Sequence, residues 1–179
     1  MKTLCVAFML LCNTSFNFLN GFDYTNNKEF VQGVKNCAVY YNSFLPAYQR
    51  VPIELVVAQS ILESNYGKSR FALEGNNLFG IKEYDLTEPH LKPLDNPNVN
   101  WGLKMYNTEC LSVVNYMDLL TTNKNYMDFQ TKLLEMWSVD NYNLYDLIHT
   151  LDNYAEDKLY FDKLLNVIEG IRKEEYLND

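Results

Sequence analysis

The sequence predicts a mainly α-helical domain with one small irregular or β lobe, and three observations lead to this fold class. Apolar residues make up 47% of the 179 residues, which is enough for one buried core. Glycine and proline are scarce, with 7 and 5 residues, which favours helices over a turn-rich β fold. Apolar residues also recur at helical spacing over most of the chain, but not over residues 81–106. We therefore expect an α+β arrangement in which a helical bundle carries the lobe.

The predicted helices follow one another along the chain, separated by residues that begin or end helices. Pro46 closes the first helix, and Pro52 stands at the first position of the second. Ser69 caps a short third helix that Gly75 ends. The last helix carries most of its apolar residues on one stripe, as expected for a helix packed on a core. The helices are expected at residues 28–45, 53–64, 69–73, 108–120, 127–137, 144–151 and 158–172.

Residues 81–106 interrupt this helical pattern and form the predicted lobe. Pro89, Pro93, Pro97 and Gly102 stand among short apolar pieces, which favours a loop or a small β structure. No low-complexity tract, internal repeat or linker divides the sequence, so we expect one folded domain.

The charge of the chain excludes electrostatic binding of nucleic acid or of an anionic membrane surface. Its formal net charge is −8, whereas contact with phosphate groups needs clustered Lys and Arg. No metal site or other cofactor is expected, because His90 and His149 lie far apart and the cysteine spacing fits no zinc pattern. The 14 tyrosines suit sugar or peptide binding, although a single tyrosine more commonly fills a helical core.

The first residues have the pattern of a secretory signal peptide. Lys2 supplies the positive start, and the apolar run over residues 4–12 is too short to span a bilayer. We place the signal at residues 1–21 and the folded domain at 27–175, which implies a periplasmic or secreted protein. An uncleaved N-terminal membrane anchor is the alternative, and acylation at Cys12 is disfavoured by the bulky leucine before it.

Two cysteines, Cys37 and Cys110, remain after removal of such a signal. Export would place them in a compartment that permits disulfides. Free buried cysteines behave as small apolar side chains, so two unpaired core thiols are the second interpretation. Both interpretations stay open on the sequence alone.

Glu63 is the first candidate for chemistry because it stands at the end of an apolar helix. A carboxylate in the last turn faces the negative end of the helix dipole, where stability would favour Lys or Arg. The dipole and partial burial both raise the pKa of such a group, as a general acid requires. Tyr66, Phe71 and Phe79 are close in sequence and would supply an apolar surrounding. The alternative is a solvated surface glutamate.

Two further segments carry candidate binding residues. In residues 76–81 (NNLFGI), the asparagine amides could bind backbone or a ligand, and Phe79 could offer a ring face. The alternative is an ordinary polar turn with this ring in the core. Residues 154–157 (YAED) stand at the entry of the last helix, where a capped helix start with Tyr154 packed inside is the alternative to a binding role.

These segments together resemble the glucosaminidase family, glycoside hydrolase family 73, and are closest to its Bax-like branch. The specific part of the resemblance lies in residues 58–71 (AQSILESNYGKSRF), followed by residues 75–81 (GNNLFGI). Weaker likeness continues through residues 105–116 and a tyrosine motif at residues 151–165. The resemblance covers roughly residues 30–172 and implies a lysozyme-like α fold with a small β lobe.

The resemblance also implies a peptidoglycan hydrolase, an endo-β-N-acetylglucosaminidase that cleaves the β-1,4 bond after N-acetylglucosamine. Glu63 matches the general acid of the family, and Tyr154 matches a motif tyrosine near the acetamido group of the sugar. The implied partner is peptidoglycan or a related glycan that contains N-acetylglucosamine, bound by a monomer without a cofactor. The full expected set is catalytic Glu63 and Tyr154 with substrate-binding Asn77, Phe79, Tyr66 and Tyr160.

The predicted lobe departs from the family pattern, in which many members carry a second acid. Catalysis assisted by the acetamido group of the substrate needs no second acid, and Tyr154 would then orient that group. The alternatives are lytic transglycosylase chemistry, a non-catalytic glycan- or peptide-binding module, and an inhibitor or effector that binds a host protein. The retained Glu63 favours an enzyme. Four acidic residues of the lobe, here called the lobe acids, match no motif: Glu83, Asp85, Glu88 and Asp95.

Overall fold

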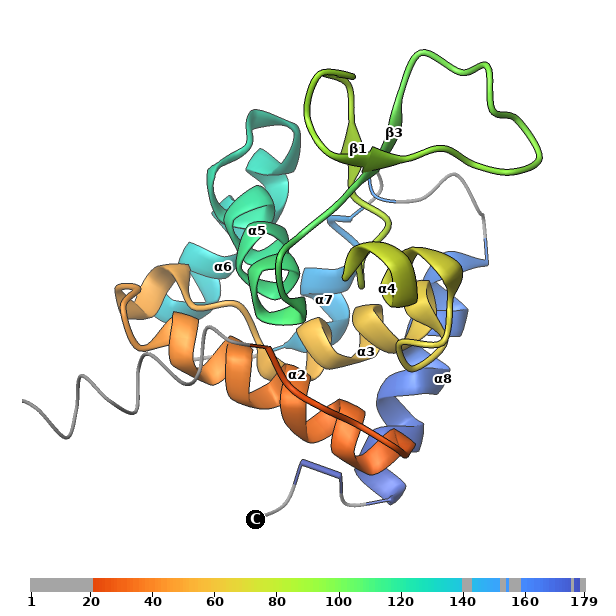
Figure 1. Ribbon diagram of the computed structural model, residues 1–179. Coiled ribbons are helices and arrows are strands. Elements are labelled where there is room, and N and C mark those ends of the chain that lie inside the picture. The colour runs from red at the N-terminus through yellow and green to blue at the C-terminus, as the bar shows by residue number, and fades with distance from the viewer. Residues whose placement is uncertain (1–20, 140–142, 152–153, 155–158, 175, 178–179) are drawn as a thin grey trace, which may run out of the picture.

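Helices form the body of the molecule, and a small lobe of short strands stands at one end of them (Figure 1). The computed structural model describes residues 21–139, 143–151, 154, 159–174, 176 and 177. The predicted signal peptide lies outside these residues except for Gly21, and so does Cys12. The α-helices are α2 (Asn27–Asn42), α3 (Ile53–Ser64), α4 (Arg70–Gly75), α5 (Glu109–Thr122), α6 (Met127–Ser138), α7 (Leu144–Ile148) and α8 (Tyr160–Lys173).

The helical bundle predicted from the sequence is confirmed, with small shifts of the helix ends. α2 ends at Asn42, three residues early, because the side-chain amide of Asn42 donates to Val51 O at 2.8 Å and accepts from Val51 N at 3.1 Å. These two bonds start a turn that contains a 3-10 helix, η1 (Ala47–Gln49). Ser69 caps α4 as predicted, since its hydroxyl accepts from Ala72 N at 3.3 Å.

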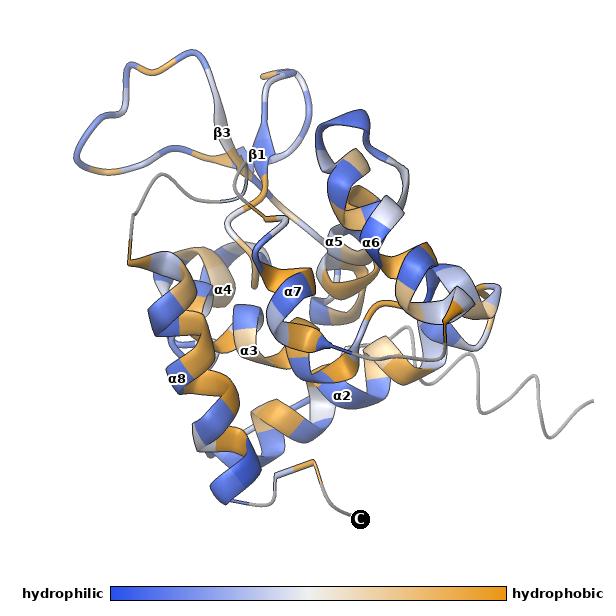
Figure 2. Ribbon diagram, turned by 180° about the vertical axis from the view of Figure 1, so that it is seen from behind, coloured by the Kyte–Doolittle hydropathy of each residue, from blue (hydrophilic) through white to orange (hydrophobic). Residues whose placement is uncertain are grey.

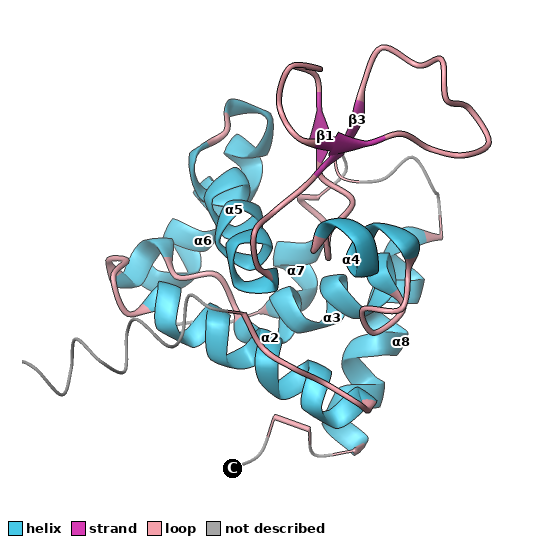
Figure 3. Ribbon diagram, viewed as in Figure 1, coloured by secondary structure: helices cyan, strands magenta, loops and turns pink. Residues whose placement is uncertain are grey.

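The lobe at residues 81–106 is a small antiparallel sheet, as the prediction allowed (Figure 3). Its strands are β1 (Lys82–Glu83), β2 (His90–Leu91) and β3 (Gly102–Lys104), in the spatial order β1-β3-β2. A further main-chain bond joins Lys104 N to Ile81 O at 2.9 Å and so extends the β1–β3 pairing to the residue that enters the lobe.

α3 lies at the centre of the core and holds the site described below in place. Leu55, Val56, Val57 and Ala58 on this helix are fully buried, and burial of one large aliphatic side chain contributes about 1.5–3 kcal/mol. Apolar and polar residues alternate around α8, as expected for a helix that covers the core with one face (Figure 2). The largest fully buried side chains outside α3 include Tyr116, Phe30 and Phe129.

A disulfide joins Cys37 on α2 to Cys110 on α5, with 5.3 Å between the two Cα atoms. The paired interpretation is therefore confirmed, and the interpretation as two free thiols is wrong. The bond links helices that are 73 residues apart in sequence and pack against each other. In the stretches of chain that the structure describes, no helix combines the length and apolar character needed to cross a bilayer.

Candidate active site

α3 ends one residue after Glu63, in a turn with left-handed backbone conformation. Residues 65–67 have φ values of 51°, 57° and 73°, which stop the helix. The Ser64 hydroxyl stabilises this turn by accepting from Gly67 N at 2.8 Å. A Cβ on Gly67 would come within 2.3 Å of the Tyr24 hydroxyl, so this position requires glycine. The turn fixes Glu63 in the last helical turn, where the sequence predicts it.

Burial raises the pKa of the half-buried Glu63 carboxyl. Removal from water disfavours the charged form, and this effect exceeds the lowering effect of a hydrogen bond from Tyr160. The last turn of α3 contains no basic residue that would offset the negative end of the helix dipole. Glu63 therefore holds its proton to a higher pH than an exposed glutamate, as a general acid needs.

A buried chain of hydrogen bonds orients the Tyr160 hydroxyl toward Glu63. Gln59, one turn earlier on α3, donates from Nε2 to Tyr160 Oη at 2.7 Å, and Tyr116 donates its hydroxyl to Oε1 of the same amide. Because the Tyr160 oxygen accepts from Gln59, its own proton is available to the Glu63 carboxylate. Burial raises the pKa of both Tyr116 and Tyr160, so both remain neutral hydroxyls.

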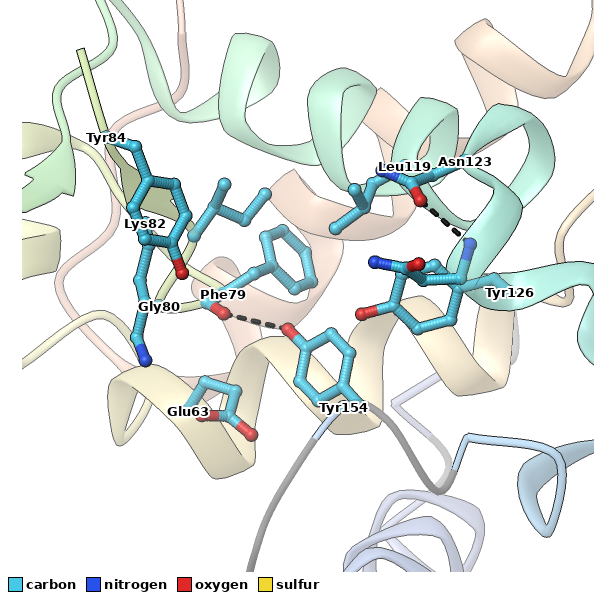
Figure 4. A pocket seen from close by; sticks show the side chains of 11 residues that line it. Glu63, Phe79, Gly80, Lys82, Tyr84, Leu119, Asn123, Tyr126 and Tyr154 are labelled. Atoms are coloured by element: carbon cyan, nitrogen blue, oxygen red, sulfur yellow. Dashed lines mark hydrogen bonds between the residues drawn. The ribbon is translucent and has the colours of Figure 1, made fainter. Parts of the chain in front are cut away.

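Glu63 lines a pocket of about 350 Å³ (Figure 4). Gly80 forms the wall beside the acid, since a Cβ there would meet Glu63 Oε2 at 3.8 Å, and its φ of +65° disfavours other residues. Among the lining residues, all within the described part of the chain, Glu63 is the sole carboxylate. The lining residues are Glu63, Phe79, Gly80, Ile81, Lys82, Tyr84, Leu119, Asn123, Asn125, Tyr126 and Tyr154.

Phe79 and Tyr154 from the predicted set both line this pocket. The Phe79 ring is buried and stacks on Tyr116, with 4.1 Å between ring centroids. Tyr154 donates its hydroxyl to Phe79 O at 2.8 Å, as Figure 4 shows. A hydroxyl that donates one hydrogen bond can still accept another, so the Tyr154 oxygen can accept a hydrogen bond from a ligand.

Asn77, also expected to bind substrate, does not line the pocket. Its side chain is buried, and its amide nitrogen donates to Ile81 O and Lys104 O, both at 2.9 Å. Its carbonyl oxygen accepts from Phe79 N at 3.3 Å and from Ile81 N at 3.1 Å. These four bonds fold the loop that carries Phe79 and attach it to β3.

The two remaining tyrosines of the predicted set lie outside the pocket lining. Tyr66 packs against Phe30 on α2, with 6.1 Å between ring centroids, and the Lys68 ammonium lies 5.7 Å from its ring centroid. Its left-handed backbone conformation accounts for this direction. Tyr160 is buried at the start of α8, where its hydroxyl hydrogen-bonds Glu63 and its ring packs against that of Tyr154, with 5.9 Å between ring centroids.

None of the four lobe acids lines the pocket. Lys82 and Tyr84 line it, so the strand pleat points the intervening Glu83 elsewhere, and Glu83 pairs with Lys104 at 3.7 Å. Asp85 is exposed, and hydrogen bonds within its own turn lower the pKa of its carboxyl. The other two lobe acids are exposed as well.

Sequence reasoning missed several residues of the site. Gln59 carried a usable signal, because an amide one turn before Glu63 in an apolar helix needs a buried partner. Lys82 follows directly after the NNLFGI segment, but only the observed strand register points it toward the pocket. Asn123 and Tyr126 follow α5 and carried no signal, since they reach the pocket by tertiary packing.

The pocket offers one proton donor, several tyrosine hydroxyls, asparagine amides and one ammonium group. Over the described residues, His, Cys, Asp and Glu side chains form no group of three or more that could hold a metal ion. This arrangement can transfer a proton at Glu63 and hydrogen-bond a polar ligand around it.

Several solved structures have the same fold. A peptidoglycan hydrolase from Sphingomonas sp. A1 is 23% identical, with a TM-score of 0.61 over 84% of this chain and 92% of that one. The catalytic domain of the autolysin Auto from Listeria monocytogenes is 20% identical, with a TM-score of 0.60 over 93% and 97%. The glycoside hydrolase domain of FlgJ from Salmonella typhimurium, truncated at its C-terminus, is 22% identical, with a TM-score of 0.56 over 83% and 99%. These likenesses confirm the predicted lysozyme-like α+β fold.

A comparison with curated protein sequences found no match. The profile of the glucosaminidase family, described as mannosyl-glycoprotein endo-beta-N-acetylglucosaminidase, matches residues 39–173. This range contains Glu63, its hydrogen-bond partners and the whole pocket lining. Because the match extends over more than half of the 179 residues, the chain belongs to the glucosaminidase family, glycoside hydrolase family 73.

Proposed function

We propose that the chain is an endo-β-N-acetylglucosaminidase that hydrolyses peptidoglycan at the β-1,4 bond after N-acetylglucosamine. The observation that carries this proposal is the half-buried Glu63 carboxyl, with its raised pKa, in the wall of a pocket. Family membership supports glycosidic chemistry, and similar structures described as a peptidoglycan hydrolase and an autolysin support the substrate class. Glu63 acts as the general acid and protonates the oxygen of the leaving sugar.

The acetamido group of the substrate serves as the nucleophile in this proposal. Two-carboxylate mechanisms need a second acid about 5–9.5 Å from the first, and no second carboxylate is among the lining residues. The acetamido oxygen attacks the anomeric carbon, and the glycosidic C–O bond breaks as Glu63 delivers its proton to the leaving oxygen. Water then adds to the anomeric carbon, the acetamido group is released, and the proton from water returns to Glu63.

Tyr154 orients the acetamido group in this mechanism. Its proton is donated to Phe79 O, so its oxygen meets the substrate as an acceptor, suited to the acetamido N–H. A hydrogen bond at that N–H leaves the acetamido oxygen free to attack. Burial raises the pKa of Tyr154 well above its ordinary value, so the hydroxyl remains neutral throughout.

Three other members of the predicted set do not contact the substrate and act through neighbouring residues. Tyr160 stabilises the ionised Glu63, while Asn77 supports the loop that carries Phe79, and Tyr66 anchors the turn after α3 to α2. We further propose that the domain, at residues 27–175, acts as a monomer outside the cytoplasm and belongs to the Bax-like branch of the family.

Lytic transglycosylase chemistry is the second candidate, because it too uses a single acid such as Glu63. The two reactions leave different ends, so mass spectrometry of digested peptidoglycan separates them. Reducing N-acetylglucosamine ends are expected, whereas 1,6-anhydro-muramic ends would indicate a transglycosylase. Intact peptidoglycan after prolonged digestion would instead indicate a glycan-binding module.

A further inference from the structure

Lys82 is the one cation among the residues that line the pocket. It lies on β1, and the strand pleat points it and Tyr84 into the pocket while Glu83 between them pairs with Lys104. Figure 4 shows the Lys82 side chain passing Gly80 on the side of the pocket where Glu63 lies. A ligand held against Glu63 therefore meets a positive charge on the lobe.

The charge of Lys82 is held in place without being neutralised. Its ammonium lies 4.6 Å from the centroid of the Trp101 ring, an attraction that fixes the side chain but leaves its protons free for an acceptor. Across the described residues, no carboxylate forms an ion pair with Lys82. Other cations of this acidic chain do have carboxylate partners: Arg70 with Glu74, Lys104 with Glu83, Lys132 with Glu135, and Arg172 with Glu54.

We propose that Lys82 binds a carboxylate of the substrate and thereby selects glycans with acidic muramyl residues over neutral polymers of N-acetylglucosamine. This inference rests on the proposed function. Cleavage after N-acetylglucosamine puts a muramyl residue on the leaving side, bonded to the oxygen that Glu63 protonates. Since Lys82 and Glu63 line one pocket, an acidic group on that residue comes within reach of the ammonium.

Two groups of peptidoglycan offer this chemistry. One is the lactyl carboxylate of a muramyl residue without peptide, and the other is a carboxylate of the peptide attached there. Both accept a charge-assisted hydrogen bond from an ammonium. In either case the Trp101 ring restricts the position of this ammonium, because its centroid lies 4.6 Å away.

The test measures binding rather than hydrolysis, so that it is separate from the test of the proposed function. Glu63→Gln serves as the parent, and calorimetry compares soluble glycan strands freed of peptide with the same strands after conversion of their carboxylates to methylamides. Strands that retain peptide, and N-acetylglucosamine oligomers, complete the set. Lys82→Met is the variant. Lys68→Met is the matched control, since the Lys68 ammonium also lies over an aromatic ring, that of Tyr66, but Lys68 does not line the pocket.

The parent is expected to bind acidic strands roughly threefold to tenfold more tightly than amidated strands, as for a partly exposed ion pair. Lys82→Met removes this preference, and Lys68→Met keeps it. A preference seen with peptide-free strands identifies the lactyl group, and one confined to peptide-bearing strands identifies the peptide. Absence of binding or of preference in the parent, or a preference that survives in Lys82→Met, overturns the inference. If the wild-type chain hydrolyses nothing while the preference depends on Lys82, the proposed function fails and the carboxylate site stands.

Discussion

Replacement of Glu63 by glutamine tests two effects of this residue separately: its role in catalysis and its destabilisation of the fold. Glutamine has nearly the same size and can still accept the hydrogen bond from Tyr160, but it cannot supply a proton. General acid catalysis contributes about 10²–10⁴-fold, so turnover of purified peptidoglycan is expected to fall by at least that factor. Release of soluble muropeptides, quantified by chromatography, measures this change.

The same substitution is expected to stabilise the fold at neutral pH. Removing an anion from the last turn of α3, which lacks a basic residue, is worth about 0.3–1 kcal/mol. For a chain of this size that corresponds to a rise in melting temperature of about 1–4 °C. Loss of a half-buried charge adds to this gain, because burial raises the pKa of Glu63.

The gain should depend on pH in a defined direction. The pKa of Glu63 is higher in the folded state than in the unfolded state, where it is about 4.3. Such a carboxyl makes its full contribution to the stability of the fold at pH values below the unfolded-state pKa, and this contribution is lost as the pH rises through the folded-state pKa. Wild type and Glu63→Gln should thus melt at similar temperatures in acid and diverge toward neutral pH. Glu169→Gln makes the same change on the exposed face of α8 and should leave turnover unaltered. Unchanged turnover in Glu63→Gln would end the catalytic assignment, and a lower melting temperature at pH 7 would refute the charge argument.

Three further predictions concern the surroundings of the acid and the frame of the fold. Tyr160→Phe removes a bond that lowers the pKa of Glu63, so the alkaline limb of kcat/KM against pH should move to higher pH; an unmoved limb contradicts this link. Tyr154→Phe should cost much of the rate while amide substitutions at each of the four lobe acids cost little; an amide that abolishes turnover identifies a base or nucleophile and rules out substrate assistance. Joint replacement of Cys37 and Cys110 by alanine should lower the free energy of unfolding in urea by up to about 4 kcal/mol, given their separation of 73 residues; an unchanged value would refute a stabilising role of the disulfide.

The helices and the acid could be predicted because their signals are local. Apolar spacing places α3 correctly, and the position of Glu63 at its end follows from the same few residues. The cap at Ser69 is likewise a property of one side chain and the next turn. The helix end at Asn42 was missed because its partner, Val51, lies nine residues later, beyond the turn that follows the helix.

Direction of side chains within the site could not be predicted from spacing. Asn77 has the same local sequence whether its amide meets a ligand or the backbone, and Lys104, 27 residues later, decides the outcome. Tyr66 follows an acid in a motif that suggests a site, yet a positive φ of 57° turns its ring toward α2. For Lys82 and Glu83 the register of a two-residue strand decides which side chain lines the pocket.

The backbone wall at Gly80 has a consequence for inhibitor design and for resistance. A ligand packed against this wall contacts main-chain atoms next to the acid, and substitution cannot remove main-chain atoms. Replacing the glycine would cost about 1–2 kcal/mol at its positive φ, and the new side chain would start 3.8 Å from Glu63 Oε2 and shield it from substrate. A mutant that escaped such a ligand at this position would thereby lose access to its own acid, so resistance should arise instead at exposed lining residues such as Tyr84, which is 68% exposed.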